Sequence, residues 1–66
     1  MEIVVNGKTE PINNEIILLT WLKGKNIDLN GLVIMINDEI IKKETWETVM
    51  IKANDAIEVL NFVSGG

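Results

Sequence analysis

A chain of 66 residues that contains neither cysteine nor histidine must hold its fold by apolar packing. A domain of this size buries only about 60% of the surface that its unfolded chain exposes, so small domains often add disulfides or metal ions. Without cysteine there is no disulfide or thiolate site, and without histidine the commonest metal ligand is missing. Hydrophobic residues make up 47% of the sequence, and we expect one domain with one core and no metal site.

The charge and the N-terminal sequence restrict the partners and the location of the protein. Ten acidic and six basic residues give a net charge of −4, which repels phosphate backbones and argues against nucleic-acid binding. The chain starts without the basic stretch and long apolar run of a signal peptide. Because no apolar run approaches the roughly 20 residues that span a bilayer, we expect no membrane segment and a cytoplasmic protein.

The first part of the chain has the pattern of a β-hairpin followed by a helix. Met1–Val5 is rich in β-branched residues, Asn6-Gly7 is typical of a type I′ turn, and Lys8–Ile12 is the expected return strand. Pro11 cannot donate to a ladder and therefore indicates an edge strand.

A helix is expected next, with apolar residues spaced i, i+3 and i+4 at Leu18, Trp21 and Leu22. Asn13 and Asn14 are typical residues for capping its start, and Gly24 or Asn26 would end it. Because residues 16–19 are apolar on nearly all sides, periodicity alone leaves a strand open for this segment.

The second part predicts three further strands, at Leu32–Ile36, Ile40–Ile41 and Ile57–Val63. Turn dipeptides that begin with asparagine precede them at residues 30–31, 37–38 and 54–55. The polar segment Lys43–Thr48 is interpreted as a loop with one helical turn, and Trp21 and Trp46 as core residues. One sheet packed on one helix, an α+β fold, is the most economical arrangement of these elements.

No catalytic set is apparent, and the most unusual feature is the end of the sequence. There is no Ser/His/Asp set, no Cys/His pair and no glycine-rich phosphate loop. Gly65 and Gly66 instead follow an apolar strand directly. Glycine has no Cβ, so such an end can enter a narrow channel, and residues 63–66 could extend about 13 Å at roughly 3.3 Å per residue. A frayed end without function is the alternative interpretation.

The order of the motifs resembles the thiamin-biosynthesis sulfur carriers of the ThiS type, which belong to the ubiquitin-like β-grasp superfamily. The resemblance covers essentially the whole chain and rests on Ile3–Gly7, Val33–Ile41, Lys42–Trp46, Asp55–Leu60 and Val63–Gly66. Asp38 and Asn54 stand where that family usually has turn glycines, and both residue types tolerate the same turn conformations.

The resemblance implies a fold, a mechanism and a set of partners. The fold would be a β-grasp domain over residues 1–63, with a mixed four- or five-stranded sheet on one helix and a flexible tail, Ser64, Gly65 and Gly66. A ubiquitin-activating-enzyme-like adenylyltransferase would activate the Gly66 carboxylate, and a sulfur donor protein would convert it to a thiocarboxylate. A thiazole synthase would receive the sulfur. The chain itself would be a carrier without cofactor or catalytic residue, and not an enzyme.

Strand parity and the resemblance together suggest where partners bind. Glu58 marks the outward face of the last strand, and Leu60 and Phe62 share its parity. The resemblance to ubiquitin-like proteins places Met35 on the same face. Met35, Leu60 and Phe62 would then form an exposed apolar patch of the kind that often marks a binding surface.

Three other functions remain open. The small subunit of molybdopterin synthase shares the β-grasp fold and the Gly-Gly end, although that family is usually longer. Another ubiquitin-like carrier is possible. In a non-covalent β-grasp binding module, the outward face alone would bind the partner and the terminus would have no function.

Overall fold

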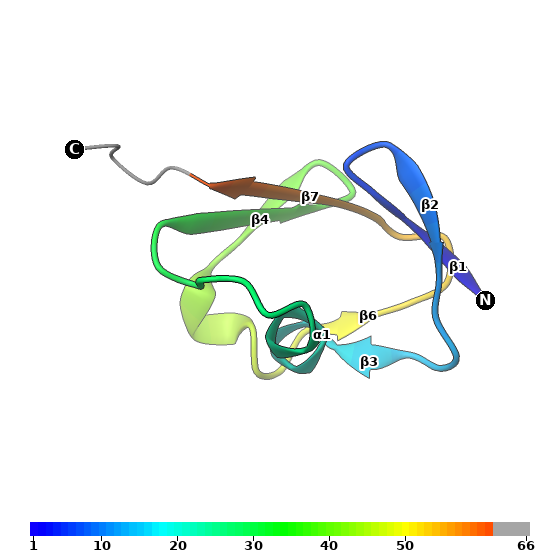
Figure 1. The fold of residues 1–66 in the computed structure, drawn as a ribbon, viewed down its shortest axis with the longest axis horizontal. Helices are drawn as coiled ribbons and strands as arrows, with labels where there is room; N and C mark the ends of the chain where they lie inside the picture. The colour runs from blue at the N-terminus through cyan, green and yellow to red at the C-terminus, as the bar shows by residue number, and fades with distance from the viewer. Residues whose placement is uncertain (62–66) are drawn as a thin grey trace.

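The computed structural model describes residues 1–61 and confirms an α+β fold in which one sheet packs on one helix (Figure 1). Within these residues the main sheet has five strands in the order β2-β1-β7-β4-β5. They are β1 (Glu2–Val5), β2 (Lys8–Pro11), β4 (Leu32–Ile36), β5 (Glu39–Ile41) and β7 (Ala56–Asn61). The other elements are β3 (Ile16–Ile17), α1 (Leu18–Gly24), the 3₁₀ helix η1 (Lys43–Thr45) and β6 (Met50–Ile51). The predicted end of the last strand, Phe62 and Val63, and the predicted tail lie outside the described residues.

Two hairpin turns have the backbone conformation that the sequence predicts. Asn6 and Gly7 both have positive φ, at 50° and 82°, as a type I′ turn requires. Asn37 and Asp38 join β4 to β5 in the same way, with φ of 51° and 70°. Asn and Asp tolerate this left-handed region, which explains how Asp38 serves where a glycine is usual in similar sequences.

Strand β7 lies in the middle of the sheet, although it is the last described strand of the chain. It pairs in parallel with β1, where Val4 lies opposite Ala56, and antiparallel with β4 from Ile36 opposite Ile57 to Leu32 opposite Asn61. Strand β2 lies at the edge beyond β1, which confirms the prediction from Pro11. The chain therefore leaves the described structure from the centre of the sheet.

The core lies between the sheet and α1, and it is apolar throughout. Among the described residues no polar or charged side chain is buried, and the core consists of Ile3, Leu18, Trp21, Leu22, Ile34, Ile36, Trp46, Ile51 and Ile57. The prediction that both tryptophans are core residues is confirmed. Trp46 is only 2% exposed, and its indole N–H donates a hydrogen bond to the carbonyl of Ile41 at 3.0 Å. This bond satisfies the one polar group of the indole ring.

The predicted start of the helix is wrong. Helix α1 begins at Leu18, its N-cap is Ile17, and no side chain caps it, so Asn13 and Asn14 do not have the predicted role. The preceding residues Ile16 and Ile17 form β3, which pairs antiparallel with β6. The sequence did not predict β6. Two β-branched residues that find a partner strand gain more from that pairing than a local asparagine cap offers to a short helix. At the other end, Asn26 takes the left-handed conformation (φ 56°) just after the helix, as expected.

Candidate functional site

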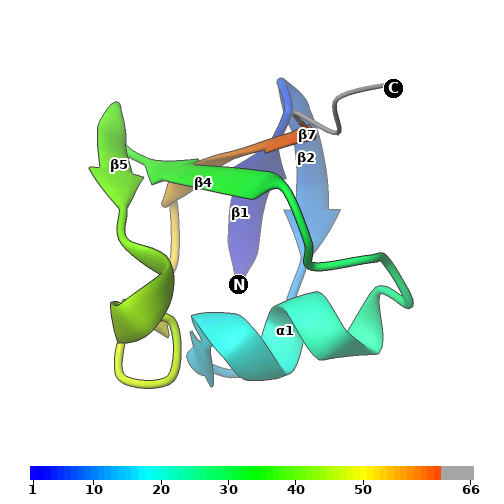
Figure 2. The same cartoon turned by 90° about the vertical axis from the view of Figure 1, so that its left-hand side faces the viewer.

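One face of the sheet is left uncovered by the other described elements. Figure 2 shows α1 and η1 on the same side of the sheet, and no helix of residues 1–61 lies on the other side. Along β7 the side chains alternate between the two sides: Ile57 is buried at 1% exposure and Glu58 is exposed. Val59 is half-buried against the core, while Leu60 is 36% exposed. The parity predicted for this strand is therefore confirmed from Ile57 to Leu60.

We call the uncovered side the open face. It carries Val4, Val33, Met35, Ile40, Ala56, Glu58 and Leu60, which alternate with core residues along β1, β4, β5 and β7. The register places Leu60 opposite Val33, and Met35 between Glu58 and Ile40. Directly opposed side chains in a sheet lie about 5 Å apart, so the apolar residues among them form one continuous surface next to Glu58.

Ile40 is the feature of the open face that sequence reasoning missed. It is 68% exposed, the highest value among the described large hydrophobic side chains that are left exposed. The register with Met35 would have revealed it, because a residue opposite an outward-facing side chain faces outward itself. A large aliphatic side chain this accessible, joined to other apolar residues, is typical of a binding surface.

The structure places two of the six predicted site residues. Met35 is half-buried and Leu60 is exposed, both on the open face, as expected. Phe62 and the predicted tail Ser64, Gly65 and Gly66 lie outside the described residues. The roles of all six residues stay predictions. The described chain ends at Asn61 on the central strand, next to Leu60.

Two asparagines hold β7 from either side through their side-chain amides. The backbone N–H of Asn6 donates to the carbonyl of Ile57 at 2.9 Å. Its side-chain Oδ1 accepts the N–H of Val59 at 2.8 Å, and its Nδ2 lies 3.4 Å from the carbonyl of Val59. A turn residue of the first hairpin thus bonds to a strand 53 positions later in the chain.

Asn37 makes the equivalent contact where β7 begins. Its backbone N–H donates to the carbonyl of Ala56 at 2.8 Å, and its Oδ1 accepts the N–H of Ala56 at 3.0 Å. Its Nδ2 donates to Oδ1 of Asp55 at 3.1 Å, and Oδ2 of the same carboxylate accepts the N–H of Lys52 at 2.8 Å. An asparagine of a neighbouring turn therefore bonds to β7 at its start, Ala56, and another bonds to it at Val59.

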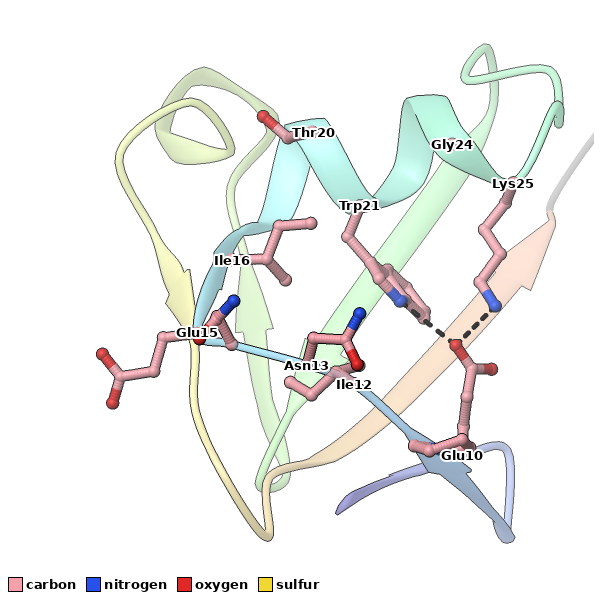
Figure 3. Close-up of a pocket in the computed structure, with 11 residues that line it drawn as sticks. Glu10, Ile12, Asn13, Glu15, Ile16, Thr20, Trp21, Gly24 and Lys25 are labelled. Atoms are coloured by element: carbon pink, nitrogen blue, oxygen red, sulfur yellow. Dashed lines mark hydrogen bonds and ion pairs between the residues drawn. The ribbon is translucent and has the colours of Figure 1, made fainter. Parts of the chain in front are cut away.

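A pocket of about 510 Å³ lies between the end of β2, the following loop and α1 (Figure 3). Oε2 of Glu10 accepts the indole N–H of Trp21 at 3.3 Å and also pairs with the ammonium of Lys25. That ammonium lies 4.9 Å from the centroid of the Trp21 ring. Glu10 and Lys25 bind each other in this pocket, and this explains how a tryptophan edge and a carboxylate pack together at the surface.

Two kinds of site are not found in the described part of the chain. Among residues 1–61 there is no group of three or more acidic residues that could hold a metal ion. None of the helices in this range is long and apolar enough to cross a membrane. The features that remain are the open face and the strand that leads to the terminus.

Comparisons with known proteins agree with this fold. The chain is similar to the crystal structure of a thiamine biosynthesis protein (ThiS) from Geobacter metallireducens, with 26% identity, full coverage of both chains and a TM-score of 0.88. An NMR structure of a thiamine biosynthesis protein from the same organism matches with 25% identity and a TM-score of 0.80, over all of this chain and 88% of the other.

One sequence relative and one family profile also match the chain. An uncharacterized protein of Trieres chinensis, ycf40, is 36% identical over 62 residues, which cover 94% of this chain and 85% of that protein. The sequence profile of the ThiS family matches residues 3–66, almost the whole chain. With both the sequence and the β-grasp fold in agreement, the chain belongs to the ThiS family.

Proposed function

We propose that this protein is a sulfur carrier for thiamin biosynthesis and that the Gly66 carboxylate carries the sulfur. In the first step a carboxylate oxygen of Gly66 attacks the α-phosphorus of ATP, and pyrophosphate leaves. Hydrosulfide then attacks the carbonyl carbon of the acyl adenylate, AMP leaves, and the terminus becomes a thiocarboxylate. If the donor is a protein persulfide, one thiol equivalent reduces the resulting acyl disulfide.

The observation that carries this proposal is the family match, which extends to Gly66. The full-length similarity to a thiamine biosynthesis protein and the central position of β7 support it. The terminus therefore follows a strand that pairs with a neighbour on each side over its first residues. In this proposal the chain supplies the acyl group, and other proteins supply the catalytic groups.

We further propose that the adenylyltransferase docks on the open face, through Met35, Leu60 and Phe62, with Ile40 as an addition from the structure. The terminus follows β7 directly, so an enzyme that holds the open face would have Gly66 within reach. Beyond Asn61 five residues remain, which extend to about 16 Å at roughly 3.3 Å per residue. This length suits an active site that lies beside a docking surface.

Intact-mass measurement of the full chain tests the chemistry directly. The protein is incubated with a ThiS-adenylating enzyme, ATP and sodium hydrosulfide. Exchange of one oxygen for sulfur at the terminus should add about 16 Da, in a reaction that needs ATP. Deletion of Gly66 should abolish the gain and leave the urea unfolding midpoint unchanged, because terminal residues commonly bear few contacts. Retained loading by the shortened chain, or no loading of the full chain, would refute the proposal.

A second step identifies the acceptor. The loaded protein is mixed with a thiazole synthase in one reaction and with the large subunit of molybdopterin synthase in another. Loss of the 16 Da with the thiazole synthase alone supports thiamin biosynthesis. Loss with the molybdopterin enzyme alone would favour the rival carrier family, and binding without any loading would favour a non-covalent module.

A further inference from the structure

We propose that Asn6 is a positioning residue that sets the direction in which the terminus leaves the sheet. This inference rests on the proposed function, because it concerns how the Gly66 carboxylate is presented for activation. It assigns a reaction-related role to a turn residue that is far from the terminus in sequence. The argument comes from the hydrogen bonds on the two sides of β7.

The Asn6 amide replaces backbone groups that the hairpin turn removes from the ladder. In a parallel pair, a residue donates to one partner and accepts from the residue two positions later on the neighbouring strand. The Asn6 N–H makes the first bond, to Ile57, in the normal way. Because the chain turns at Asn6, its carbonyl leaves the sheet, and its side-chain Oδ1 accepts the N–H of Val59 instead. The Nδ2 group then approaches the Val59 carbonyl, where a continuing strand would have placed its next N–H.

The consequence is that β7 is held on both sides as far as Val59. On the β4 side, pairing continues to Asn61, opposite Leu32. On the β1 side, the backbone contribution ends at the Ile57 carbonyl, and the Asn6 side chain alone adds the bonds at Val59. Without that side chain, β7 at Val59 would lose its bonds on the β1 side and could twist about the β4 edge.

Such twisting would affect a reaction more than it affects the fold. Val59 lies two positions before Asn61, so a change in its orientation changes the direction in which the described strand ends. Small misplacements of a reacting group, on the order of 1 Å, can lower a rate by up to about a hundredfold. Met35 and Ile40 lie on β4 and β5, and β4 still pairs with Leu60, so binding of the enzyme should be preserved.

Asn37 provides a matched control. Its φ is nearly the same as that of Asn6, and its Oδ1 also accepts a hydrogen bond from a backbone N–H of β7. Substitution of either asparagine by glycine removes one of these side-chain contacts. Glycine accepts the positive φ at either position, so the change removes the side chain without adding backbone strain. The two contacts differ in place: Asn37 holds the start of β7, and Asn6 holds the part nearest the terminus.

The experiment compares Asn6→Gly and Asn37→Gly in the full chain. The adenylating enzyme, ATP and hydrosulfide are used, and kcat and KM for loading are measured by intact mass. We expect both variants to lose stability to a similar extent. Asn6→Gly alone should lower kcat about three- to tenfold with KM unchanged, and its Val59 amide should lose protection from hydrogen exchange.

Each other outcome overturns the inference. Equal kcat values for the two variants would show that Asn6 acts only through stability. A rise in KM without a fall in kcat would make it a docking residue. If Asn6→Gly does not fold, Asn6→Asp is measured instead: it keeps the acceptor for the Val59 N–H, so kcat should stay within twofold of the value for the unaltered chain, and a larger fall would overturn the inference. If the unaltered chain does not load, the proposed function itself fails, and the inference fails with it.

Discussion

The open face makes a quantitative prediction at Ile40, the most accessible of its large side chains. Full burial of an isoleucine side chain is worth about 1.5–3 kcal/mol. Ile40 is 68% exposed, so roughly one third of that gain is already realised in the free protein, and about two thirds remains for a partner to bury. Covering it should therefore contribute about 1–2 kcal/mol to docking, which is roughly a five- to thirtyfold change in Kd.

The substitution Ile40→Thr tests this estimate. Threonine keeps the β-branch that suits a strand but loses most of the apolar surface. We expect Kd for the adenylating enzyme to rise by the factor above, as measured by isothermal titration calorimetry. Urea unfolding, followed by the fluorescence of the two buried tryptophans, should show a loss of stability below about 1 kcal/mol, because the side chain is mostly exposed.

Ile17→Thr is the matched control for this experiment. Ile17 is also an exposed isoleucine in a short strand, at 36%, but it pairs with Met50 in β3 and β6, on the α1 side of the sheet (Figure 1). Its substitution should leave Kd for the adenylating enzyme within twofold of the value for the unaltered protein. The reasoning is refuted if Ile40→Thr also stays within twofold, or if Ile17→Thr weakens binding as much.

Two further predictions concern the fold. Trp46→Phe removes the donor to the Ile41 carbonyl and leaves space around a smaller ring, so the free energy of unfolding in urea should fall by about 1–3 kcal/mol. A fall below about 0.5 kcal/mol, the size expected of surface substitutions, would contradict the assigned bond. Asn14→Ala should cost less than about 0.5 kcal/mol in the same assay, because α1 has no side-chain cap; a loss near 1 kcal/mol, typical of a removed cap, would show that this residue caps the helix after all.

The strand pattern and the turns followed from the sequence because their causes are local. Asn6-Gly7 and Asn37-Asp38 can adopt positive φ, and this preference belongs to the residues themselves. Pro11 indicated an edge strand because it lacks an N–H wherever it is placed. The alternation around Glu58 assigned Leu60 to the outward face, since successive side chains of a strand point in opposite directions.

The start of the helix could not be predicted in the same way. Asn13 and Asn14 are good caps by local preference, yet Ile16 and Ile17 form a strand because Met50 and Ile51 lie opposite them. That partner strand is more than 30 residues away in the sequence and too short to be recognised by its own pattern. Pairing between distant segments therefore outweighed a capping preference worth about 1 kcal/mol.

The sequence by itself determined the family, the turn conformations and the direction in which most strand residues face, because these depend on residue type and on a period of two. Only the tertiary structure decided that β7 lies at the centre of the sheet, that Ile40 completes the open face, and that Asn6 reaches Val59. These three facts depend on which strands become neighbours. Neighbours are selected by the packing of the whole core, which no short segment encodes alone.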